Sequence, residues 1–336
     1  MARFGSIAFA LALGLAAPIA AFAADPAYNI THRFAGPDGG WDYASFDPAS
    51  RQLFVAHGDG VMAIDVDTGK ISPHLADASR SHIVLPIPGT GDLLVTNGGD
   101  NTARILDRAT GALKGTIQTG KGPDAAAYDP VTKRLFVMDH AGGDVTIIDG
   151  AAMKVAGSIA IGGDLEFAVA DGKGRLYVNV EDKAQIAVVD TRAQKVVTRY
   201  ALAGCEEPSG LALTTSGALI SACANGVAKV TQASTGKDLA TLKIGARPDA
   251  VIYDAARGLA LIPCGGDGTL TIIDTKTAMP VVIGSVATQR GARTGTLDPK
   301  TGRVYLPTAK YGAPAAAGQR PSMVPGSFEV LELTPG

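Results

Sequence analysis

The segment KGPDAAAYDPVTKRLFVMDHAGGDVTIIDG, residues 121–150, predicts the fold of the whole chain. It contains three short runs with alternating apolar positions, DAAAYD, LFVMD and VTIID, separated by the turn sequences DPVTKR and AGGD. Alternation bounded by Gly, Pro and Asp favours pleated strands over helix. The segment is therefore expected to form a small three-stranded antiparallel sheet.

Near-copies of this segment recur along the chain. The third run of each copy ends at an acidic or polar residue, and these residues are Asp65, Asp107, Asp149, Asp190, Gln232, Asp274 and Glu332. The first six are spaced by 42, 42, 41, 42 and 42 residues, a period typical of the four-stranded blades of a β-propeller. The seventh follows 58 residues later, because a Pro-, Gly- and Ala-rich stretch at about 310–327 is inserted as a loop.

A fourth strand is expected to complete each unit. Several units continue from the acidic residue into a Thr-Gly turn that leads to an outer strand, as in residues 65–69, DVDTG. The last unit lacks such a strand after Glu332, but residues 28–34, YNITHRF, are spare at the other end. We predict an all-β fold, a seven-bladed propeller of four-stranded antiparallel blades. Residues 24–336 form this single domain, and pairing of 28–34 with the last blade closes the ring.

The first 23 residues, MARFGSIAFALALGLAAPIAAFA, have the features of a secretory signal peptide. A cation at Arg3 precedes an apolar run, and an A-x-A sequence predicts cleavage near Ala23. An uncleaved membrane anchor is the alternative. The mature chain is expected to be soluble, and either periplasmic or secreted. Of the three cysteines, Cys205 and Cys223 are the candidate disulfide, with a Cys223–Cys264 bridge or three free thiols as the alternatives.

The charge content restricts the partners. A net charge of -2 with 18% charged residues provides no basic surface for nucleic acid or anionic lipid. A small polar ligand or an envelope protein is the expected partner, without membrane insertion after signal cleavage, and the chain is expected to be a monomer. With Trp41 as the one tryptophan, neither WD repeats nor the tryptophan-docked blades of quinoprotein dehydrogenases are supported.

The repeat resembles the YVTN-type β-propeller family. The stretches that carry the resemblance are GKGPDAAAYDPVTKRLFVMD, GKGRLYVNV, GDLLVTNGGDNTARILDRATG and GARPDAVIYD. The resemblance covers essentially the whole mature chain and implies an exported, bacterial-type propeller. It leaves the function open, because the family includes binding and surface-layer proteins and has lactonases and a lyase among its structural relatives.

Hairpin spacing indicates where a site would lie. In each blade, the residue opening the first strand precedes the residue closing the second by 14 or 15 positions, and antiparallel pairing is expected to make them neighbours. These pairs are Asp42 with His57, His82 with Asn97, Asp124 with Asp139, Glu166 with Val180, Ser209 with Cys223, Asp249 with Cys264, and Arg293 with Thr308. Stacked around a ring, they are expected to converge on one mouth of the central channel.

The polar members of these pairs are the candidate ligand-binding residues. They are Asp42, His57, His82, Asn97, Asp124, Asp139, Glu166, Asp249 and Arg293, with Arg290 close by in the sequence. Carboxylates and imidazoles at one concave site suit metal ligation or acid–base chemistry, although a water-filled mouth would be polar in any case. Catalytic residues cannot be assigned. The metal candidates are His82, Asp124 and Glu166, whereas His32 and His74 are expected at the surface.

Three functions fit this pattern. The favoured one is binding of a ligand or partner at the mouth, since no nucleophile and base occur at a recognisable spacing. The alternative is a metal-assisted hydrolase, lactonase or lyase acting on a small polar substrate. A structural envelope protein is the third. No cofactor is evident, but a divalent metal is compatible with the residues, and the 310–327 loop is expected near the mouth as a lid or partner-binding loop.

Overall fold

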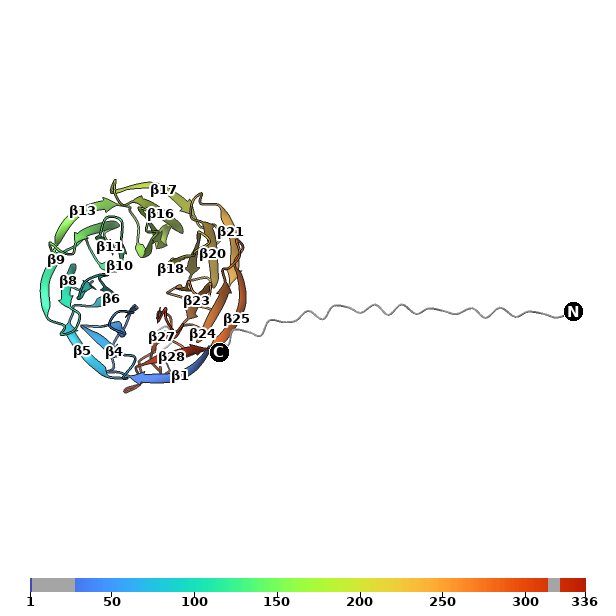
Figure 1. The fold of residues 1–336 in the computed structure, drawn as a ribbon, viewed down its shortest axis with the longest axis horizontal. Helices are drawn as coiled ribbons and strands as arrows, with labels where there is room; N and C mark the ends of the chain where they lie inside the picture. Colours follow the sequence, from blue (N-terminus) through green and yellow to red (C-terminus); the bar gives the residue numbers. More distant parts are fainter. Residues whose placement is uncertain (2–27, 314–320) are drawn as a thin grey trace.

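The computed structural model describes residues 28–313 and 321–336, together with Met1. The predicted signal peptide and the middle of the 310–327 insertion lie outside the described residues. Seven four-stranded antiparallel sheets surround a central axis, which confirms the predicted seven-bladed propeller (Figure 1). Among the described residues, no helix is long and apolar enough to cross a membrane.

The first six blades follow the chain from the innermost strand to the outermost. Blade 1 comprises β2 (Ala44–Asp47), β3 (Gln52–His57), β4 (Gly60–Asp65) and β5 (Ile71–Asp77). Blade 2 comprises β6 (Ser81–Pro86), β7 (Asp92–Asn97), β8 (Thr102–Asp107) and β9 (Leu113–Gln118). Blade 3 comprises β10 (Pro123–Asp129), β11 (Arg134–Asp139), β12 (Asp144–Asp149) and β13 (Lys154–Ala160).

The second half of the ring repeats this order. Blade 4 comprises β14 (Leu165–Ala170), β15 (Arg175–Val180), β16 (Gln185–Asp190) and β17 (Lys195–Ala201), with the 3-10 turn η1 (Glu181–Lys183) after β15. Blade 5 comprises β18 (Pro208–Leu213), β19 (Ala218–Cys223), β20 (Val227–Gln232) and β21 (Asp238–Lys243). Blade 6 comprises β22 (Ile252–Asp254), β23 (Leu259–Cys264), β24 (Thr269–Asp274) and β25 (Val281–Ala287).

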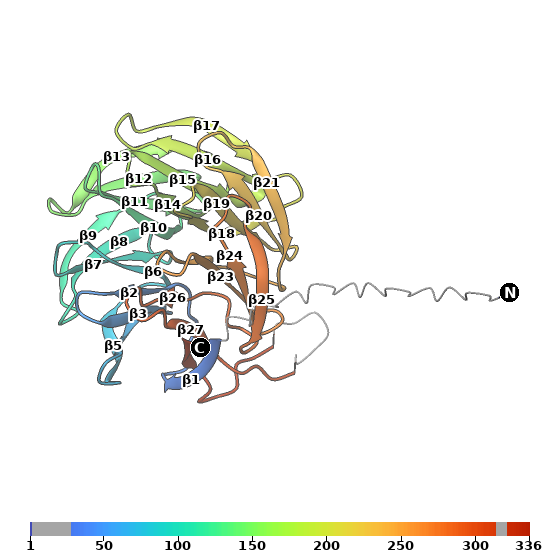
Figure 2. The ribbon, with the colours of Figure 1, turned by 45° about the vertical axis from the view of Figure 1, so that its right-hand side comes forward.

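Blade 7 combines the two ends of the chain. It comprises β26 (Thr296–Leu297), β27 (Val304–Thr308), β28 (Glu329–Pro335) and β1 (Tyr28–Ala35). Strand β1 pairs antiparallel with β28, from Tyr28 opposite Pro335 to Ala35 opposite Glu329, and Figure 2 shows β1 beside the C-terminal end of the chain. This is the predicted ring closure, and it gives β28 a partner on both sides.

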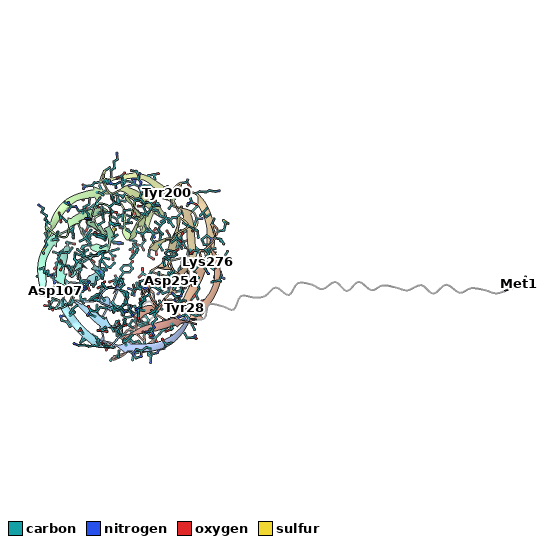
Figure 3. All side chains as sticks on the ribbon, in the orientation of Figure 1. Met1, Tyr28, Asp107, Tyr200, Asp254 and Lys276 are labelled. Carbon is teal, nitrogen blue, oxygen red and sulfur yellow. A yellow bond between two sulfur atoms is a disulfide. The ribbon has the colours of Figure 1, made fainter. Side chains whose placement is uncertain are left out.

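The acidic residue at the end of each third strand acts in the turn, as expected. Asp107, on the outer part of blade 2 (Figure 3), accepts hydrogen bonds from the backbone N–H groups of Ala109 and Thr110. Gly111 completes the turn with φ +72°, and a Cβ there would collide with the carbonyl oxygen of Leu75 in blade 1. The turn therefore fixes both the outer strand and the contact between two blades.

The hydrophobic core lies between the blades. Middle strands are buried on both faces: Leu53 to Ala56 of β3 and Leu135 to Met138 of β11 are at most 1% exposed. One apolar cluster runs continuously through blades 2, 3 and 4. Each blade is thus held by its neighbours, which keeps the innermost strands, and the residues that open them, in fixed positions around the axis.

Candidate functional site

The predicted pairs separate into two sets with different surroundings. The channel residues, which open the first strands, are Asp42, His82, Asp124, Glu166, Ser209, Asp249 and Arg293. The anchor residues, which close the second strands, are His57, Asn97, Asp139, Val180, Cys223, Cys264 and Thr308, and each is at most 8% exposed. Five of the channel residues contact one another from blade to blade: Asp42, His82, Asp124, Asp249 and Arg293.

The expected pairing was wrong by one residue in five blades. The observed partners are Ser81 with Asn97, Pro123 with Asp139, Leu165 with Val180, Pro208 with Cys223, and Pro248 with Cys264. In blades 2 to 5, a register shift follows at once in the first strand, as in a β-bulge. Because successive side chains point to opposite faces, this slip separates each channel residue from its expected neighbour.

Anchor residues fasten the loop that enters their blade. The side-chain oxygen of Asn97 accepts a hydrogen bond of 2.9 Å from the N–H of Ser79, in the loop before β6. The hydroxyl of Thr308 donates to the carbonyl of Arg290, 3.1 Å away, in the loop before β26. The structure therefore places Asn97 inside blade 2, and it places the exposed Arg290 in a loop.

Asp139 has the same role in blade 3. Its Oδ2 accepts a hydrogen bond of 2.6 Å from the Thr146 hydroxyl, which in turn accepts one from the N–H of Gly120 in the incoming loop. Burial, supported by the nearby charge of Asp144, raises the pKa of Asp139 to about 7. Asp139 therefore belongs to the blade interior and not to the mouth, contrary to the sequence-based expectation.

His57 also lies away from the other candidate ligands. Its ring packs edge-on against Phe328, with ring centroids 4.5 Å apart, and beneath the loop at Gly39. Burial lowers its pKa. His57 thus anchors the loop that follows β1. His32 and His74 are exposed, as expected.

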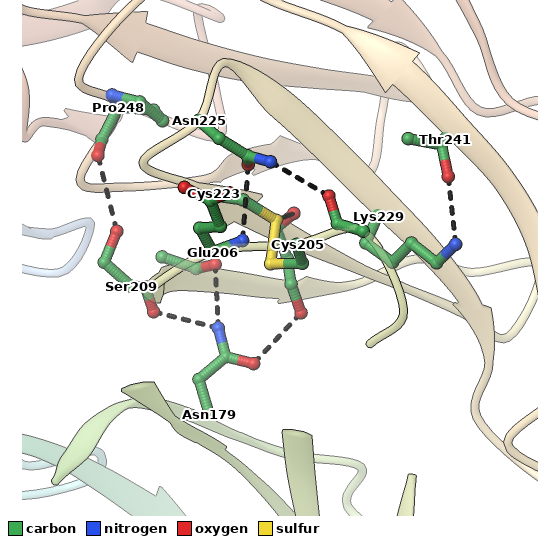
Figure 4. The surroundings of a disulfide bond; sticks show 12 residues. Asn179, Cys205, Glu206, Ser209, Cys223, Asn225, Lys229, Thr241 and Pro248 are labelled. Atoms are coloured by element: carbon green, nitrogen blue, oxygen red, sulfur yellow. Dashed lines mark hydrogen bonds between the residues drawn. A yellow bond between two sulfur atoms is a disulfide. The ribbon is translucent and has the colours of Figure 1, made fainter. Parts of the chain in front are cut away.

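In blade 5, the anchor is covalent. Cys223 forms a disulfide with Cys205, in the loop before β18, with the Cα atoms 5.4 Å apart (Figure 4). The amide of Asn225 donates to the carbonyl of Gly204 in the same loop, at 3.0 Å. Cys264, the remaining cysteine, is free and buried. The bridge occupies the position at which other blades use hydrogen bonds.

The channel residues form a chain of contacts across five blades. Nδ1 of His82 lies 2.7 Å from Oδ2 of Asp42 and 3.5 Å from Oδ1 of Asp124. On the other side, Nε of Arg293 lies 2.7 Å from Oδ2 of Asp249, and its Nη2 lies 3.7 Å from Oδ1 of Asp42. Candidates from blades 1, 2, 3, 6 and 7 are thus brought together.

His140, which was not among the sequence candidates, completes the cluster. Its Nδ1 lies 3.2 Å from Oε1 of Glu166 and 3.1 Å from the carbonyl of Leu165. The ion pair with Glu166 raises the pKa of His140 to about 9, against the effect of burial. The alternation of side chains along a strand could have identified His140 from the sequence. It directly follows the anchor residue Asp139, so its side chain points to the other face. Glu181 holds the same position in blade 4.

Burial and like charges control the protonation of the cluster. The pKa of Asp124 is raised well above its usual value by burial and by the charges of Asp42 and Glu166. The pKa of Asp249 is raised to about 7 by burial and by Asp42, although Arg293 opposes the shift. Burial opposes the charged form of His82, but its two carboxylate neighbours outweigh this, so its pKa is raised.

Tyr43 follows Asp42 at the same mouth, and its backbone N–H donates to the carbonyl of His82, at 3.0 Å. Its pKa is raised well above the usual value by burial and by four carboxylates, those of Asp249, Glu166, Asp124 and Asp42. Its ring packs on Phe167, with centroids 5.2 Å apart. Because blades 1 and 4 are not neighbours (Figure 1), this contact crosses the channel. Both rings also line a mainly apolar cavity of about 360 Å³ with Ile83, Ala126 and Val251.

The described ends of the 310–327 insertion lie near the same mouth. Tyr311 pairs with Met323 and packs near Trp41, with ring centroids 6.3 Å apart. The carbonyl of Trp41 accepts a hydrogen bond from Nη2 of Arg293, at 3.3 Å. The insertion therefore begins and ends close to the loop that delivers Asp42, and residues 314–320 lie outside the described part of the chain.

Comparison with known proteins supports the fold. No family model matches the sequence. PE-PGRS family protein PE_PGRS18 of Mycobacterium tuberculosis is 40% identical over 57 residues, a match that covers 17% of this chain and 12% of that protein. The chain thus spans about an eighth of that relative's length, and the match shows no family.

Two solved structures resemble the whole propeller. A chain of the mitotic checkpoint complex has a TM-score of 0.75 and 16% identity, covering 98% of this chain and 99% of that one. A chain of Kuenenia stuttgartiensis hydrazine synthase has a TM-score of 0.69 and 17% identity, covering 83% and 95%. At such low identity, these likenesses show the propeller fold alone.

Proposed function

We propose that this protein binds a positively charged small ligand at the channel mouth, through Asp42, Asp124, Glu166 and Asp249. One observation carries the proposal: four carboxylates from four blades meet at one mouth, connected through His82, His140 and Arg293, and their side chains are only 12–24% exposed. Carboxylates in such a space repel one another and lose hydration, so a cation among them is strongly favoured.

The cations of the protein itself satisfy only part of this demand. Arg293 pairs with Asp249, His82 with Asp42, and His140 with Glu166. Within the described part of the chain, Asp124 has no salt bridge other than the longer contact of 3.5 Å with His82. A ligand that brings positive charge to Asp124 would complete the pairing.

Export to an oxidising compartment and membership of the YVTN-type family belong to the same proposal. The Cys205–Cys223 disulfide supports export, because such bonds persist outside the reducing cytosol. The signal-like features of residues 1–23 support it as well. A propeller that captures a ligand in the periplasm, or after secretion, combines these observations.

The second candidate is a metal-assisted hydrolase, lactonase or lyase at the same mouth. One observation favours it: histidine and carboxylate atoms gather in two sets that share Asp124. Among the hydrogen bonds that histidines make in the described residues, none reaches a serine hydroxyl or the thiol of Cys264. This candidate predicts lactone or ester hydrolysis by the metal-loaded protein and loss of that activity in Asp124→Asn.

Calorimetry with a panel of small ions tests the binding function. The panel holds spermidine, choline and divalent metal ions as cations, with phosphate and glutarate as anions. At least one cation is expected to bind to the wild type and not to Asp124→Asn. Asp139→Asn is the matched control, because it makes the same change in the same hairpin, but inside the blade. Failure of every cation to bind, or equal binding to both variants, would overturn the proposal.

A further inference from the structure

We propose that Asp42, His82 and Asp124 hold a divalent transition-metal ion, of the zinc or manganese class, at the channel mouth. This inference rests on the proposed cation-binding function and names the ligand class. One ligand atom from each of the three residues lies within 4.8 Å of the others. The residues come from blades 1, 2 and 3, at equivalent positions of the repeat, so three separate blades converge on the site.

The spacing of the ligand atoms fits a small ion. Nδ1 of His82 lies 2.7 Å from a carboxylate oxygen of Asp42 and 3.5 Å from one of Asp124. Zinc binds nitrogen and oxygen at about 2.0–2.2 Å, so two ligands in a tetrahedral arrangement lie about 3.4 Å apart. The separation from Asp124 is close to this value, and that from Asp42 is shorter, so the Asp42 carboxylate would have to move outward on metal binding.

Asp124 provides independent support. Its Oδ1 is buried and has no hydrogen-bond partner among the described residues. A buried polar atom without a partner costs stability, and a carboxylate oxygen costs more than a neutral group. Among the described residues, its contact with a cationic group is that with the imidazole of His82, at 3.5 Å. A metal ion between the two would give Oδ1 the partner that the protein does not supply.

The backbone around the three ligands is already fixed. The hydroxyl of Thr294 donates to the carbonyl of Asp42 at 2.7 Å, and that of Thr96 donates to the carbonyl of Asp124 at 2.6 Å. The ring of His82 lies against Gly98, where an added Cβ would be 2.7 Å from Nε2. Nδ1 is therefore the nitrogen directed at the carboxylates. Such supporting contacts orient metal ligands in proteins.

The donor set indicates the class of metal. One imidazole with two carboxylates suits zinc, manganese, iron or cobalt, whereas calcium and magnesium prefer oxygen donors alone. A second set, Asp124 with His140 and Glu166, also meets the distance condition. The first set is preferred, because Nδ1 of His140 is already engaged by the carbonyl of Leu165 at 3.1 Å.

Titration of the chelator-stripped protein with Zn²⁺ and Co²⁺ tests the inference. One ion per chain is expected in calorimetry, and Co²⁺ is expected to give visible absorption bands. His82→Gln and Asp42→Asn are expected to weaken binding at least about 100-fold, more than the usual effect of losing a supporting contact. Asp139→Asn, which makes a similar change inside blade 3, is expected to bind as the wild type does.

Gly98→Ala is a second variant that removes no ligand. Its new methyl group displaces the His82 ring, so Zn²⁺ binding is expected to weaken about 10-fold or more while the fold remains intact. Absence of Zn²⁺ and Co²⁺ binding at millimolar concentration, or equal binding by the wild type, His82→Gln and Gly98→Ala, would overturn the inference. If spermidine then still bound in an Asp124-dependent way, the proposed function would stand without the metal.

Discussion

Replacing Asp139 by asparagine is expected to stabilise the protein above pH 7 and to change little near pH 4. The pKa of this carboxyl is about 7 in the folded protein, against an ordinary value of 3.8. Because the folded-state pKa is raised, the folded protein keeps a proton that the unfolded chain has lost. The wild type therefore loses stability as the pH rises from about 4 to 7, and the loss is complete above that range.

The size of the effect follows from the two pKa values. A difference of roughly three units, at about 1.4 kcal/mol per unit, amounts to about 4 kcal/mol at pH 8. Asparagine has no proton to lose, and its carbonyl oxygen can accept the hydrogen bond from Thr146. The side chain is fully buried, so solvent does not screen this difference.

Urea unfolding of the wild type and of Asp139→Asn, with the disulfide intact, measures the effect at pH 4.5, 6 and 8. The two free energies of unfolding are expected to be similar at pH 4.5 and to diverge toward pH 8, with the variant more stable. Parallel pH profiles, or a variant that is less stable at pH 8, would refute the burial argument. Unchanged cation binding by the variant would show that Asp139 does not belong to the mouth.

Three further predictions concern the scaffold. Reducing the Cys205–Cys223 disulfide, which spans 18 residues, is expected to lower the free energy of unfolding by about 3 kcal/mol, whereas Cys264→Ser should leave the response to reductant unchanged. Gly111→Ala is expected to destabilise the protein more than Gly69→Ala does. Both glycines have φ +72°, but only at Gly111 would the added Cβ collide with Leu75. Thermal unfolding of the two variants measures the difference in stability. Deleting residues 28–35 is expected to expose the edge of β28, so the variant should form oligomers by light scattering while a chain that retains these residues remains monomeric.

The repeat architecture could be predicted from the sequence because the period is long and regular. The acidic turn residues, such as Asp107, repeat at nearly constant spacing, and their hydrogen bonds to the following N–H groups explain why they set the frame. Strand order, the number of blades and the closure by β1 followed from that frame. These features depend on local turn chemistry and on counting, both of which a single sequence contains.

The candidate site could be predicted only in part from the sequence. Spacing identified Asp42, His82 and Asp124 correctly as residues that meet one another, because they occupy equivalent positions in consecutive blades. It misassigned Asp139, because a register shift of one residue leaves no mark on hairpin length. It also missed His140, which directly follows Asp139, so that its side chain lies on the opposite face and contacts Glu166. Side-chain direction at a bulge depends on tertiary pairing, which spacing alone does not specify.

Closure by β1 has a consequence for the order in which the molecule forms. The hydroxyl of Thr31 bonds to Glu332 across 301 residues, whereas each of the first six blades is built from one contiguous segment. During synthesis, β1 thus has no partner until the final residues emerge. Until then, the first six blades can form while the seventh blade remains incomplete. Moving the chain ends to a loop between two other blades would make the seventh blade contiguous and place the ring closure elsewhere, which would reveal whether this closure limits the folding rate.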